Sequence, residues 1–362
     1  MKVAYLLGSI NRGGAETLIL DVFKNTDKAN FAVVGMHRLG GAYETDFYAT
    51  RQKLYHIQPK RLGFIRYFLK LRRTLKAEDV TIAHAQMAID AIYAKLATIG
   101  LPIKVVTTFH GFDIGAGGLT KLRNRLAIRC ADKICFVSEY EQRYYEQRYP
   151  IGNKGSVVYN GIDFDKINRC AKNQAKEFDI KGPKLCCVGS FGSGRSQIVI
   201  CKALGILKAK GIEPEFYFIG GKRNSEPNVY DACYDYCQQF HLEHVHFMGN
   251  RSDVYELEKS MDGFVYSTVH DTFGIAVVEA MAAGLPVIVN DWAVMKEITK
   301  DGQWATLFKT EDAEDCANKI EDLLNHLEER KAQAQGIAKE VRKEYSIEKH
   351  IERLNEIYNS II

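Results

Sequence analysis

The stretch from His270 to Pro286 constrains the fold of this chain more than any other. A β-rich run over residues 263–267 precedes it, and a second run over 286–289 closes it. Between these runs the chain has room for one short helix. Gly284 and Pro286 would end that helix, because glycine favours the left-handed cap and proline cannot continue a helix. The sequence therefore predicts a strand–helix–strand unit.

Two acids flank the expected start of this helix. Asp271 precedes the helix, Glu279 lies inside it, and the backbone N–H groups of Gly274 and Ile275 fall between them. Free N–H groups at a helix N-terminus bind anions, and Glu279 shares a helical face with Ile275. A sugar–diphosphate–ribose ligand has the matching layout, with phosphates between two sets of hydroxyls. The alternative is that Asp271 caps the helix and Glu279 is solvated.

This stretch resembles the signature of family-4 glycosyltransferases of the GT-B fold: an acid, seven residues and Glu around Phe-Gly, followed by Glu-Ala-Met-Ala-Ala-Gly-Leu-Pro-Val. The resemblance implies an α/β chain of two Rossmann-like αβα domains facing across a cleft, with a C-terminal helix that crosses back to the N-terminal domain. It assigns Glu279 to the ribose, and Asp271 and Phe273 to the donor sugar. The Gly274 and Ile275 amides would bind the donor diphosphate. One departure is Asp271, where the family usually has the longer Glu.

Two segments of the first half also resemble the family. Gly13-Gly14-Ala15-Glu16 follows an expected strand and opens a helix, so its N–H groups can approach the donor diphosphate. The glycine spacing is not that of the dinucleotide fingerprint, and a mere tight turn is the alternative. His110, in Thr107–Asp113, comes straight off a strand, where open αβ sheets present ligand groups. In the family this histidine points at the donor sugar; without the resemblance, a hydrogen-bonded structural histidine is favoured.

Two segments of the second half complete the resemblance. Arg195, in the glycine-rich loop 189–196, offers a forked cation suited to phosphate, the alternative being an exposed loop arginine. The family usually has Arg where this chain has Ser190, so one donor-binding cation is missing. Gly249 and Asn250 end a segment that resembles the family's Phe-x-Gly turn, which flanks the nucleotide base.

The 362 residues are too many for one ordinary domain. A segment at 157–163 resembles the family's passage between domains. We therefore expect residues 1–163, with the terminal helix 345–362, to form an acceptor-binding domain and residues 164–344 to form a donor-binding domain. The expected strands, which alternate with helical patterns, span 3–7, 31–36, 54–57, 80–84, 104–108, 133–137, 156–159, 185–188, 215–219, 245–247, 264–266 and 287–289.

Basic side chains gather in one stretch, although the net charge is only +4. From Arg51 to Lys76 there are nine basic residues and no acid. Apolar residues interleave with them at helical spacing: Phe64, Tyr67, Phe68 and Leu71. Residues 60–76 therefore predict an amphipathic basic helix, either packed with a solvated basic face or bound to an anionic membrane surface or a lipid-linked acceptor. Nucleic acid is not expected, because no recognisable binding module accompanies the charge.

Nine cysteines, with Cys186 and Cys187 adjacent in an apolar strand, and no apparent export signal favour a reducing compartment, the cytoplasm. The protein could then be peripheral on the inner face of the cytoplasmic membrane.

Two patterns raise the question of a metal site. Asp163 and Asp165 form an Asp-x-Asp pair, but two carboxylates alone do not make a divalent site. Cys233, Cys237 and His241 recur at helical spacing, where small cysteines fit the apolar face of a helix. We expect no metal and no resident cofactor.

The resemblance as a whole implies a retaining, metal-independent hexosyltransferase. It would move a sugar from a UDP- or GDP-type nucleotide sugar to a glycan or lipid-linked acceptor, in surface polysaccharide or glycolipid biosynthesis. Two alternatives stay open. One is a nucleotide-sugar 2-epimerase of the same fold, which needs no acceptor. The other is a degenerate, non-catalytic nucleotide-sugar-binding or membrane-associated protein, which the departures at Ser190 and Asp271 motivate.

Overall fold

The computed structural model describes residues 1–26, 31–59, 63–170 and 182–362. The chain divides into two compact units. Unit 1 comprises Met1–Ile162 and Tyr345–Ile362, and unit 2 comprises Asp163–Glu344. The boundary expected from the sequence, after Asp163, lies one residue further along the chain. Each unit is described by itself below.

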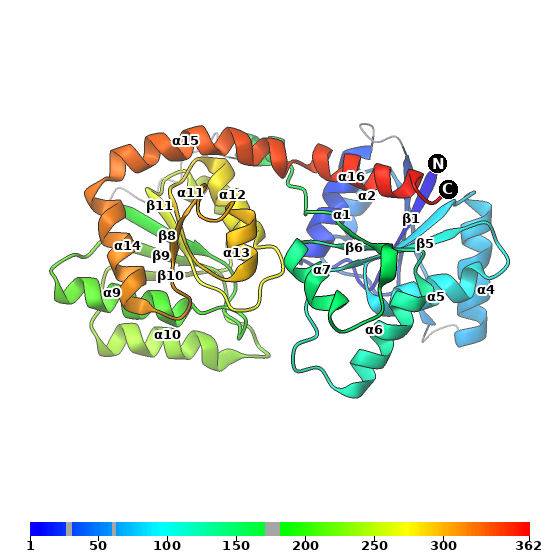
Figure 1. Ribbon diagram of the computed structural model, residues 1–362, viewed down its shortest axis with the longest axis horizontal. Coiled ribbons are helices and arrows are strands. Elements are labelled where there is room, and N and C mark those ends of the chain that lie inside the picture. The colour runs from blue at the N-terminus through cyan, green and yellow to red at the C-terminus, as the bar shows by residue number, and fades with distance from the viewer. Residues whose placement is uncertain (27–30, 60–62, 171–181) are drawn as a thin grey trace. The chain divides into compact units, whose positions relative to one another are not determined.

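Unit 1 is built on a parallel sheet, which has seven strands within the described residues, in the order β3-β2-β1-β4-β5-β6-β7 (Figure 1). The strands are β1 Lys2–Leu7, β2 Ala32–His37, β3 Lys53–His56, β4 Ile82–Ala85, β5 Lys104–Phe109, β6 Lys133–Phe136 and β7 Gly155–Val157. The helices are α1 Gly14–Lys24, α2 Glu44–Ala49, α4 Phe64–Ala77, α5 Ala88–Thr98, α6 Gly118–Cys130, α7 Glu139–Glu146, the 3-10 turn Gly152–Lys154, and α16 Ile347–Asn359.

Helices cover both faces of this sheet. As a result, β1 is buried along its length except at its first residue. Tyr5 packs into one core cluster with side chains of α1 and α16. Leu6, the next residue, packs into a second cluster with side chains of α4 and α5. Successive residues of a strand point to opposite faces. A strand buried on both faces reads as a continuous apolar run, which is how Val3–Leu7 appears in the sequence.

The last helix, α16, is tied to the sheet of unit 1 by a buried hydrogen-bonded chain. Ser346 caps the start of this helix, since its Oγ accepts a backbone N–H of the first turn at 3.1 Å. Tyr358 Oη lies 2.6 Å from His84 Nδ1 and 3.1 Å from Tyr5 Oη. His84 Nε2 lies 2.7 Å from Thr108 Oγ1. Burial lowers the pKa of His84 to about 3, so the ring is neutral and the chain joins α16 to β1, β4 and β5 without a buried charge.

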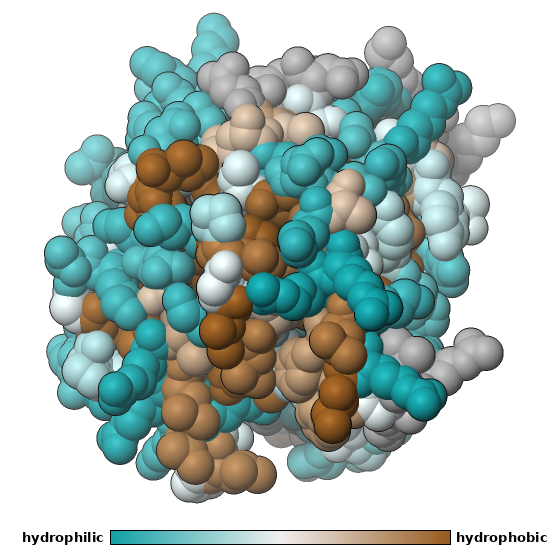
Figure 2. Space-filling model, turned by 90° about the vertical axis from the view of Figure 1, so that its right-hand side faces the viewer, coloured by the Kyte–Doolittle hydropathy of each residue, from teal (hydrophilic) through white to brown (hydrophobic). Residues whose placement is uncertain are grey.

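Helix α4 carries most of the predicted basic stretch, although residues 60–62 lie outside the described part of the chain. It packs on the sheet through Tyr67, Leu71 and Leu75, which are buried. Phe64 was expected on this apolar face, but it is not buried there: it lies in the first turn of α4 and is 62% exposed. Figure 2 views the molecule from the side that carries α4 and α5, and it shows hydrophobic side chains at the surface among hydrophilic ones.

Unit 2 also has a parallel sheet, of six strands in the described residues, in the order β10-β9-β8-β11-β12-β13 (Figure 1). The strands are β8 Lys184–Val188, β9 Glu215–Ile219, β10 Val245–Gly249, β11 Gly263–Tyr266, β12 Val287–Asn290 and β13 Thr306–Phe308. The helices are α8 Phe164–Cys170, α9 Gln197–Ala209, α10 Pro227–Gln239, α11 Val254–Glu258, α12 Ile275–Ala283, α13 Ala293–Ile298, α14 Ala313–Asn325 and α15 Leu327–Glu344. Helices α9 and α10 lie on one side of the sheet and α12 on the other.

Twelve of the thirteen described strands were predicted, each to within two residues. The missed strand, β13, is only three residues long and pairs with β12 alone, at the edge of the sheet. Among the helices that the structure describes, none combines the length and the apolar composition needed to cross a bilayer. The eight cysteines whose side chains are described are all free thiols.

Candidate active site

The predicted site residues fall into two sets. Gly13, Gly14 and His110 belong to unit 1; Arg195, Gly249, Asn250, Asp271, Phe273, Gly274, Ile275 and Glu279 belong to unit 2.

The set in unit 2 centres on the point where the strand order reverses. Strand β8 pairs with β9 on one side and with β11 on the other. Open αβ sheets bind ligands at such a switch point, outside the carboxyl ends of the strands. The loop after β8 carries Arg195, and the loop after β11 carries Asp271. The two loops are joined by Thr268 Oγ1, which donates to Gly194 O at 2.9 Å.

Arg195 is held by an aromatic ring and a carboxylate. Its guanidinium carbon lies 5.2 Å from the centre of the Tyr266 ring, and its Nη2 lies 3.7 Å from Asp271 Oδ1. Tyr266 Oη donates to the other oxygen of Asp271. Burial disfavours the charged guanidinium, but Tyr266 and Asp271 outweigh burial and raise the pKa of Arg195. Within the described residues its Nη1 is buried without a hydrogen-bond partner. A buried donor without an acceptor is costly, so Nη1 is placed to donate to an anionic ligand.

Gly189 is required for this position of Arg195. The first residue after β8 has a φ of +149°, a backbone conformation that favours glycine. A Cβ at Gly189 would lie only 2.0 Å from Arg195 Nη1. Any other residue here would therefore displace the guanidinium. Gly189 is needed because its missing side chain leaves room for Arg195, and not because glycine is flexible.

Helix α12 begins and ends as the sequence predicts. Gly274 is left-handed, with a φ of +83°, and a Cβ there would lie 2.7 Å from Met295 Cε. Gly284 ends the helix, also left-handed with a φ of +82°. The first intrahelical acceptor is Gly274 O, which accepts from Val277 and Val278. The amides of Gly274 and Ile275 therefore have no acceptor within the helix, as an anion site requires.

Glu279 is half-buried on α12, one turn beyond Ile275. Tyr255 Oη, from α11, donates to Glu279 Oε1 at 2.7 Å. This hydrogen bond holds the carboxylate against α11, a contact that no sequence motif predicts. A second acid, Glu258, lies buried on α11, and both of its carboxyl oxygens lack a partner within the described residues. Burial, and then the charge of Glu279, raise the pKa of Glu258 well above its ordinary value.

We expect Glu258→Gln to flatten the dependence of stability on pH. The folded chain holds Glu258 protonated, whereas the unfolded chain ionises it above about pH 4.5, so the stability that this group contributes is lost as pH rises. The loss can reach about 1.4 kcal/mol per pH unit until the folded pKa is passed. Urea unfolding followed by tryptophan fluorescence reports unit 2, which holds both tryptophans, Trp292 and Trp304. The free-energy difference between variant and wild type should grow in the variant's favour with pH. Curves that stay parallel from acid to neutral pH would contradict a protonated Glu258.

A cation that the sequence analysis missed stands beside Ser190. Arg223 Nε donates to Ser190 Oγ at 3.0 Å, and a Cβ at Gly192 would lie 2.8 Å from Arg223 Nη1. Arg223 comes from the loop after β9, which neighbours β8 in the sheet. Its signal was present as Gly220-Gly221-Lys222-Arg223 directly after a predicted strand. A cation from the adjacent loop thus lies next to Ser190, where the family usually has an arginine of its own.

Asn250 and Phe273 are placed differently from one another. Asn250 packs on the same loop, since a Cβ at Gly221 would lie 2.5 Å from its amide atoms, and Gly249 before it is left-handed with a φ of +65°. The Phe273 side chain, by contrast, is 2% exposed in the core of unit 2. The ring of Phe273 therefore packs inside the protein and only its backbone is left to face a ligand, so the sugar-binding role of Phe273 stays a prediction.

In unit 1, His110 lines a pocket of about 340 Å³ at the carboxyl ends of β4 and β5. His110 Nε2 donates to Gln86 Oε1 at 2.9 Å, because an amide oxygen can only accept. Burial, and then the charge of His350, lower the pKa of His110 to about 4, so the ring is neutral. Gln86 is 7% exposed, and within the described residues its Nε2 has no partner. Gln86 was not singled out in the sequence.

Gly13 and Gly14 open helix α1, as the sequence predicts, with Gly13 as the N-cap. Glu16 lies in the first turn, and its Oε2 would be 2.5 Å from a Cβ on Gly13. A carboxylate at this helix end opposes a phosphate there. The diphosphate role of the two glycines stays a prediction, which Glu16 disfavours.

The residues raised as metal ligands have other contacts. Asp163 Oδ1 accepts from the backbone N–H of Lys166 at 3.1 Å, as an N-cap of α8 does. Cys233 and Cys237 are buried on α10, at 0% and 2% exposure, in the packing role given to them. Among the described residues, no group of three His, Cys, Asp or Glu side chains is placed to hold a metal ion.

Comparison with known proteins identifies the family. Residues 12–166 match the model of "Glycosyltransferase Family 4", and residues 169–340 match that of "Glycosyl transferases group 1". The N,N'-diacetylbacillosaminyl-diphospho-undecaprenol alpha-1,3-N-acetylgalactosaminyltransferase of Campylobacter jejuni is 32% identical over 277 residues, which cover 71% of this chain and 70% of that protein. The chain belongs to glycosyltransferase family 4. The resemblance expected from the Asp271–Val287 stretch is thereby confirmed.

Other known proteins match at lower identity. The UDP-Gal:alpha-D-GlcNAc-diphosphoundecaprenol alpha-1,3-galactosyltransferase of Escherichia coli is 24% identical over 238 residues, 62% of this chain and 61% of that protein. Among solved structures, Anabaena HepE in complex with UDP and glucose superposes with a TM-score of 0.86 at 18% identity, over 99% of this chain and 100% of HepE. The superposition confirms the GT-B fold class.

Proposed function

We propose that this family-4 glycosyltransferase transfers a sugar from a nucleoside-diphosphate sugar to a glycan or lipid-linked acceptor, with retention of the anomeric configuration and without a metal ion. The observation that carries the proposal is the buried, unpartnered Nη1 of Arg195, in a loop joined to the one that leads into α12. A cation and a free helix N-terminus together neutralise a diphosphate. Asp271 and Glu279 flank that helix start along the chain and supply acceptors for hydroxyl groups.

The donor would be held in three parts. Arg195, the Gly274 and Ile275 amides, and Arg223 in place of the missing cation would bind the diphosphate. Glu279, positioned by Tyr255, would accept from the ribose hydroxyls. Asp271 would accept from the donor sugar, and the residues at Gly249 and Asn250 would flank the base. A UDP- or GDP-type donor is proposed; HepE is solved with UDP, and the E. coli relative is named for UDP-Gal, which favours testing UDP sugars first.

Transfer follows a front-side route in this proposal. The acceptor hydroxyl oxygen bonds to the anomeric carbon on the face from which the diphosphate leaves, and the bond between that carbon and the phosphate oxygen breaks. The departing phosphate oxygen takes the acceptor's proton. Charge that develops on the diphosphate is stabilised by preorganised donors, which is the largest contribution such a site can make. The family assigns His110 to the donor sugar, and that role remains part of the proposal.

Lipid-linked acceptors are the substrates for which the two transferase relatives are named, and both names contain a diphospho-undecaprenol. We propose the same acceptor class here, in surface polysaccharide or glycolipid biosynthesis. A cytoplasmic enzyme, peripheral on the inner face of the membrane, fits the free thiols and the basic helix α4. Among the basic residues of α4, we do not assign Arg72 to the membrane surface, because it donates to the carbonyls of Ala97 and Ile99 at 3.0 and 2.6 Å.

The test is transfer itself. The chain is incubated with radiolabelled UDP and GDP sugars and a short-chain polyprenyl-diphosphate sugar, with and without excess EDTA. We expect one of the donors to give a labelled lipid product at the same rate with EDTA as without it. NMR of the product should show the same anomeric configuration as in the donor. An inverted product, or a rate that a divalent ion restores, would contradict the mechanism. Epimerised nucleotide sugar formed without acceptor would support the epimerase, and donor binding without transfer to any acceptor would support a non-catalytic protein.

A further inference from the structure

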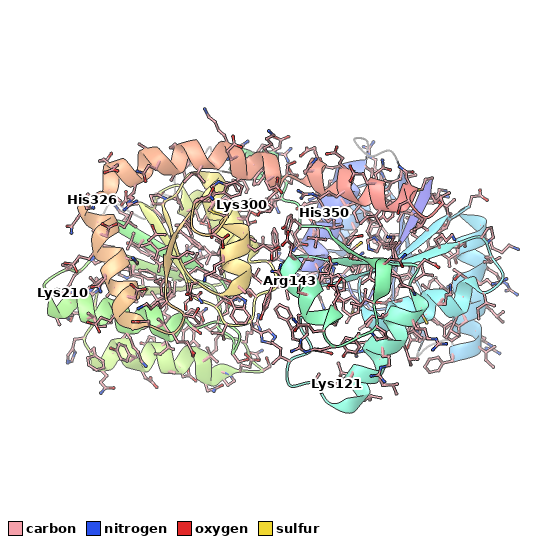
Figure 3. The ribbon with its side chains drawn as sticks, viewed as in Figure 1. Lys121, Arg143, Lys210, Lys300, His326 and His350 are labelled. Carbon is pink, nitrogen blue, oxygen red and sulfur yellow. The ribbon has the colours of Figure 1, made fainter. Side chains whose placement is uncertain are left out.

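A second pocket of unit 1 has the character of an anion site. It encloses about 560 Å³ between α6, α7 and the loop that leads into α6. Three cations and three tyrosines line it: Lys121, Arg125, Arg148, Tyr140, Tyr144 and Tyr149. In Figure 3, Lys121 lies near the first turn of α6, well apart from Arg143 on α7. None of these six residues lines the pocket of His110 or belongs to a site assigned above.

The positive charge of this pocket is available to a ligand. In the part of the chain that the structure describes, no carboxylate forms an ion pair with Lys121, Arg125 or Arg148. Arg148 instead stacks on the Tyr144 ring, with 3.7 Å between its guanidinium carbon and the ring centre, and donates to Tyr144 O at 2.9 Å. A stacked guanidinium keeps its remaining N–H groups in a fixed direction.

The one acid that lines the pocket is already engaged. Asp113 accepts from Tyr144 Oη at 2.7 Å, from Asn124 Nδ2 at 3.1 Å and from Tyr149 Oη. Burial alone would raise the pKa of Asp113, but hydrogen bonds from Tyr149, Tyr144 and Asn124 lower it. Asp113 therefore orients the tyrosines and leaves a net positive pocket.

Exposed apolar side chains belong to the same segments that line the pocket. Helix α6 has no acid, and its first turns present Leu119 at 83% exposure and Leu122 at 52%. Ile114, which lines the pocket, is 52% exposed. Contiguous exposed apolar side chains beside basic ones are typical of a surface that contacts lipid. Asp113 and Ile114 also line the pocket of His110, so the two pockets adjoin.

We propose that this pocket binds the diphosphate of a lipid-linked acceptor, with the lipid chain along the exposed leucines of α6. The inference rests on the proposed function, which it deepens by giving the acceptor's charged group a site. A diphosphate suits three converging cations, because charge-assisted hydrogen bonds to phosphate oxygens are the strongest that such groups make. The acceptor sugar next to that diphosphate would then enter the adjoining pocket of His110.

The test uses the full chain and farnesyl diphosphate, titrated in dilute non-ionic detergent. Lys121→Gln combined with Arg125→Gln should weaken binding at least about tenfold, since two phosphate-binding cations are lost. The matched control is Arg143→Gln, an exposed arginine whose ion pair is with Glu139 on its own helix, at 3.3 Å. The control should bind as the wild type does. Farnesyl diphosphate that binds the double variant as tightly as the wild type, or that does not bind the wild type, overturns the proposal.

Two further arms separate the source of the phosphate and the donor site. Inorganic pyrophosphate should bind more weakly than farnesyl diphosphate, and Leu119→Gln with Leu122→Gln should remove that difference. The control is Leu39→Gln, at a leucine of the same unit that follows β2 and is 55% exposed, and it should leave the difference unchanged. Equal binding of pyrophosphate and farnesyl diphosphate to the wild type would overturn the lipid part and leave a site for free diphosphate. UDP and GDP titrations of the Lys121/Arg125 variant should match the wild type. Nucleotide binding without farnesyl diphosphate binding removes this inference and keeps the donor site; the reverse result removes the donor site alone.

Discussion

Glu279→Gln is expected to lower kcat/KM for the nucleotide sugar about a hundredfold, which corresponds to about 3 kcal/mol of lost transition-state stabilisation. The substitution keeps the shape of the side chain and replaces a charged acceptor by a neutral amide. Charged hydrogen bonds contribute about 1.5–3 kcal/mol each, and both ribose hydroxyls would lose the charge of their acceptor. Tyr255, which donates to Glu279 Oε1 at 2.7 Å, can still donate to the amide oxygen, so folding should be retained.

The measurement is the initial rate of transfer from whichever UDP or GDP sugar the wild-type enzyme uses, together with thermal unfolding of each variant. Tyr255→Phe should give an intermediate loss, because it removes the hydrogen bond to Glu279 Oε1 and keeps the carboxylate. Glu321→Gln is the matched control: this acid of unit 2 lies on α14 and pairs at the surface with Lys210, at 2.7 Å, and such a pair contributes little. A Glu279→Gln enzyme with the kinetics of the control would remove Glu279 from the site.

The regular parts of the fold could be predicted because their physical signals are local. The stretch before Pro286 carries its own helix stop, and both ends of α12 follow the sequence. Strands buried on both faces show as apolar runs, so β1 was readable. β13 was missed because three edge residues leave no periodicity to read. The family motif was dense enough to indicate the GT-B fold from the sequence.

What could not be predicted depends on contacts between distant segments. Arg223 reaches Ser190 only because β9 and β8 are neighbours in the sheet. The burial of Phe273 follows from packing in unit 2, which a motif does not show. Gln86 lies 24 residues before His110 and meets it because β4 pairs with β5. Sequence spacing thus indicated the loops to which we assign the chemistry, and the sheet order determined which side chains of those loops lie together.

Arg195→Met is expected to weaken binding of the nucleoside diphosphate roughly thirtyfold or more, since a forked, charge-assisted contact to phosphate contributes about 2 kcal/mol or more. Met keeps the packing against Tyr266 and removes the charge. Gly189→Ala should weaken binding similarly without touching a ligand group, because its Cβ would occupy the place of Arg195 Nη1, 2.0 Å away. The matched control is Arg330→Met, on α15, whose guanidinium pairs with Asp322 at 2.7 Å.

Calorimetric titration of UDP and GDP into these four proteins tests most directly whether the loops after β8 and β11 of unit 2 hold a nucleoside diphosphate. We expect one of the two nucleotides to bind the wild type and the Arg330→Met control alike, and to bind Arg195→Met and Gly189→Ala far more weakly. A titration of Arg195→Met that superimposes on the wild type, or a wild-type chain that binds neither nucleotide, would contradict the account.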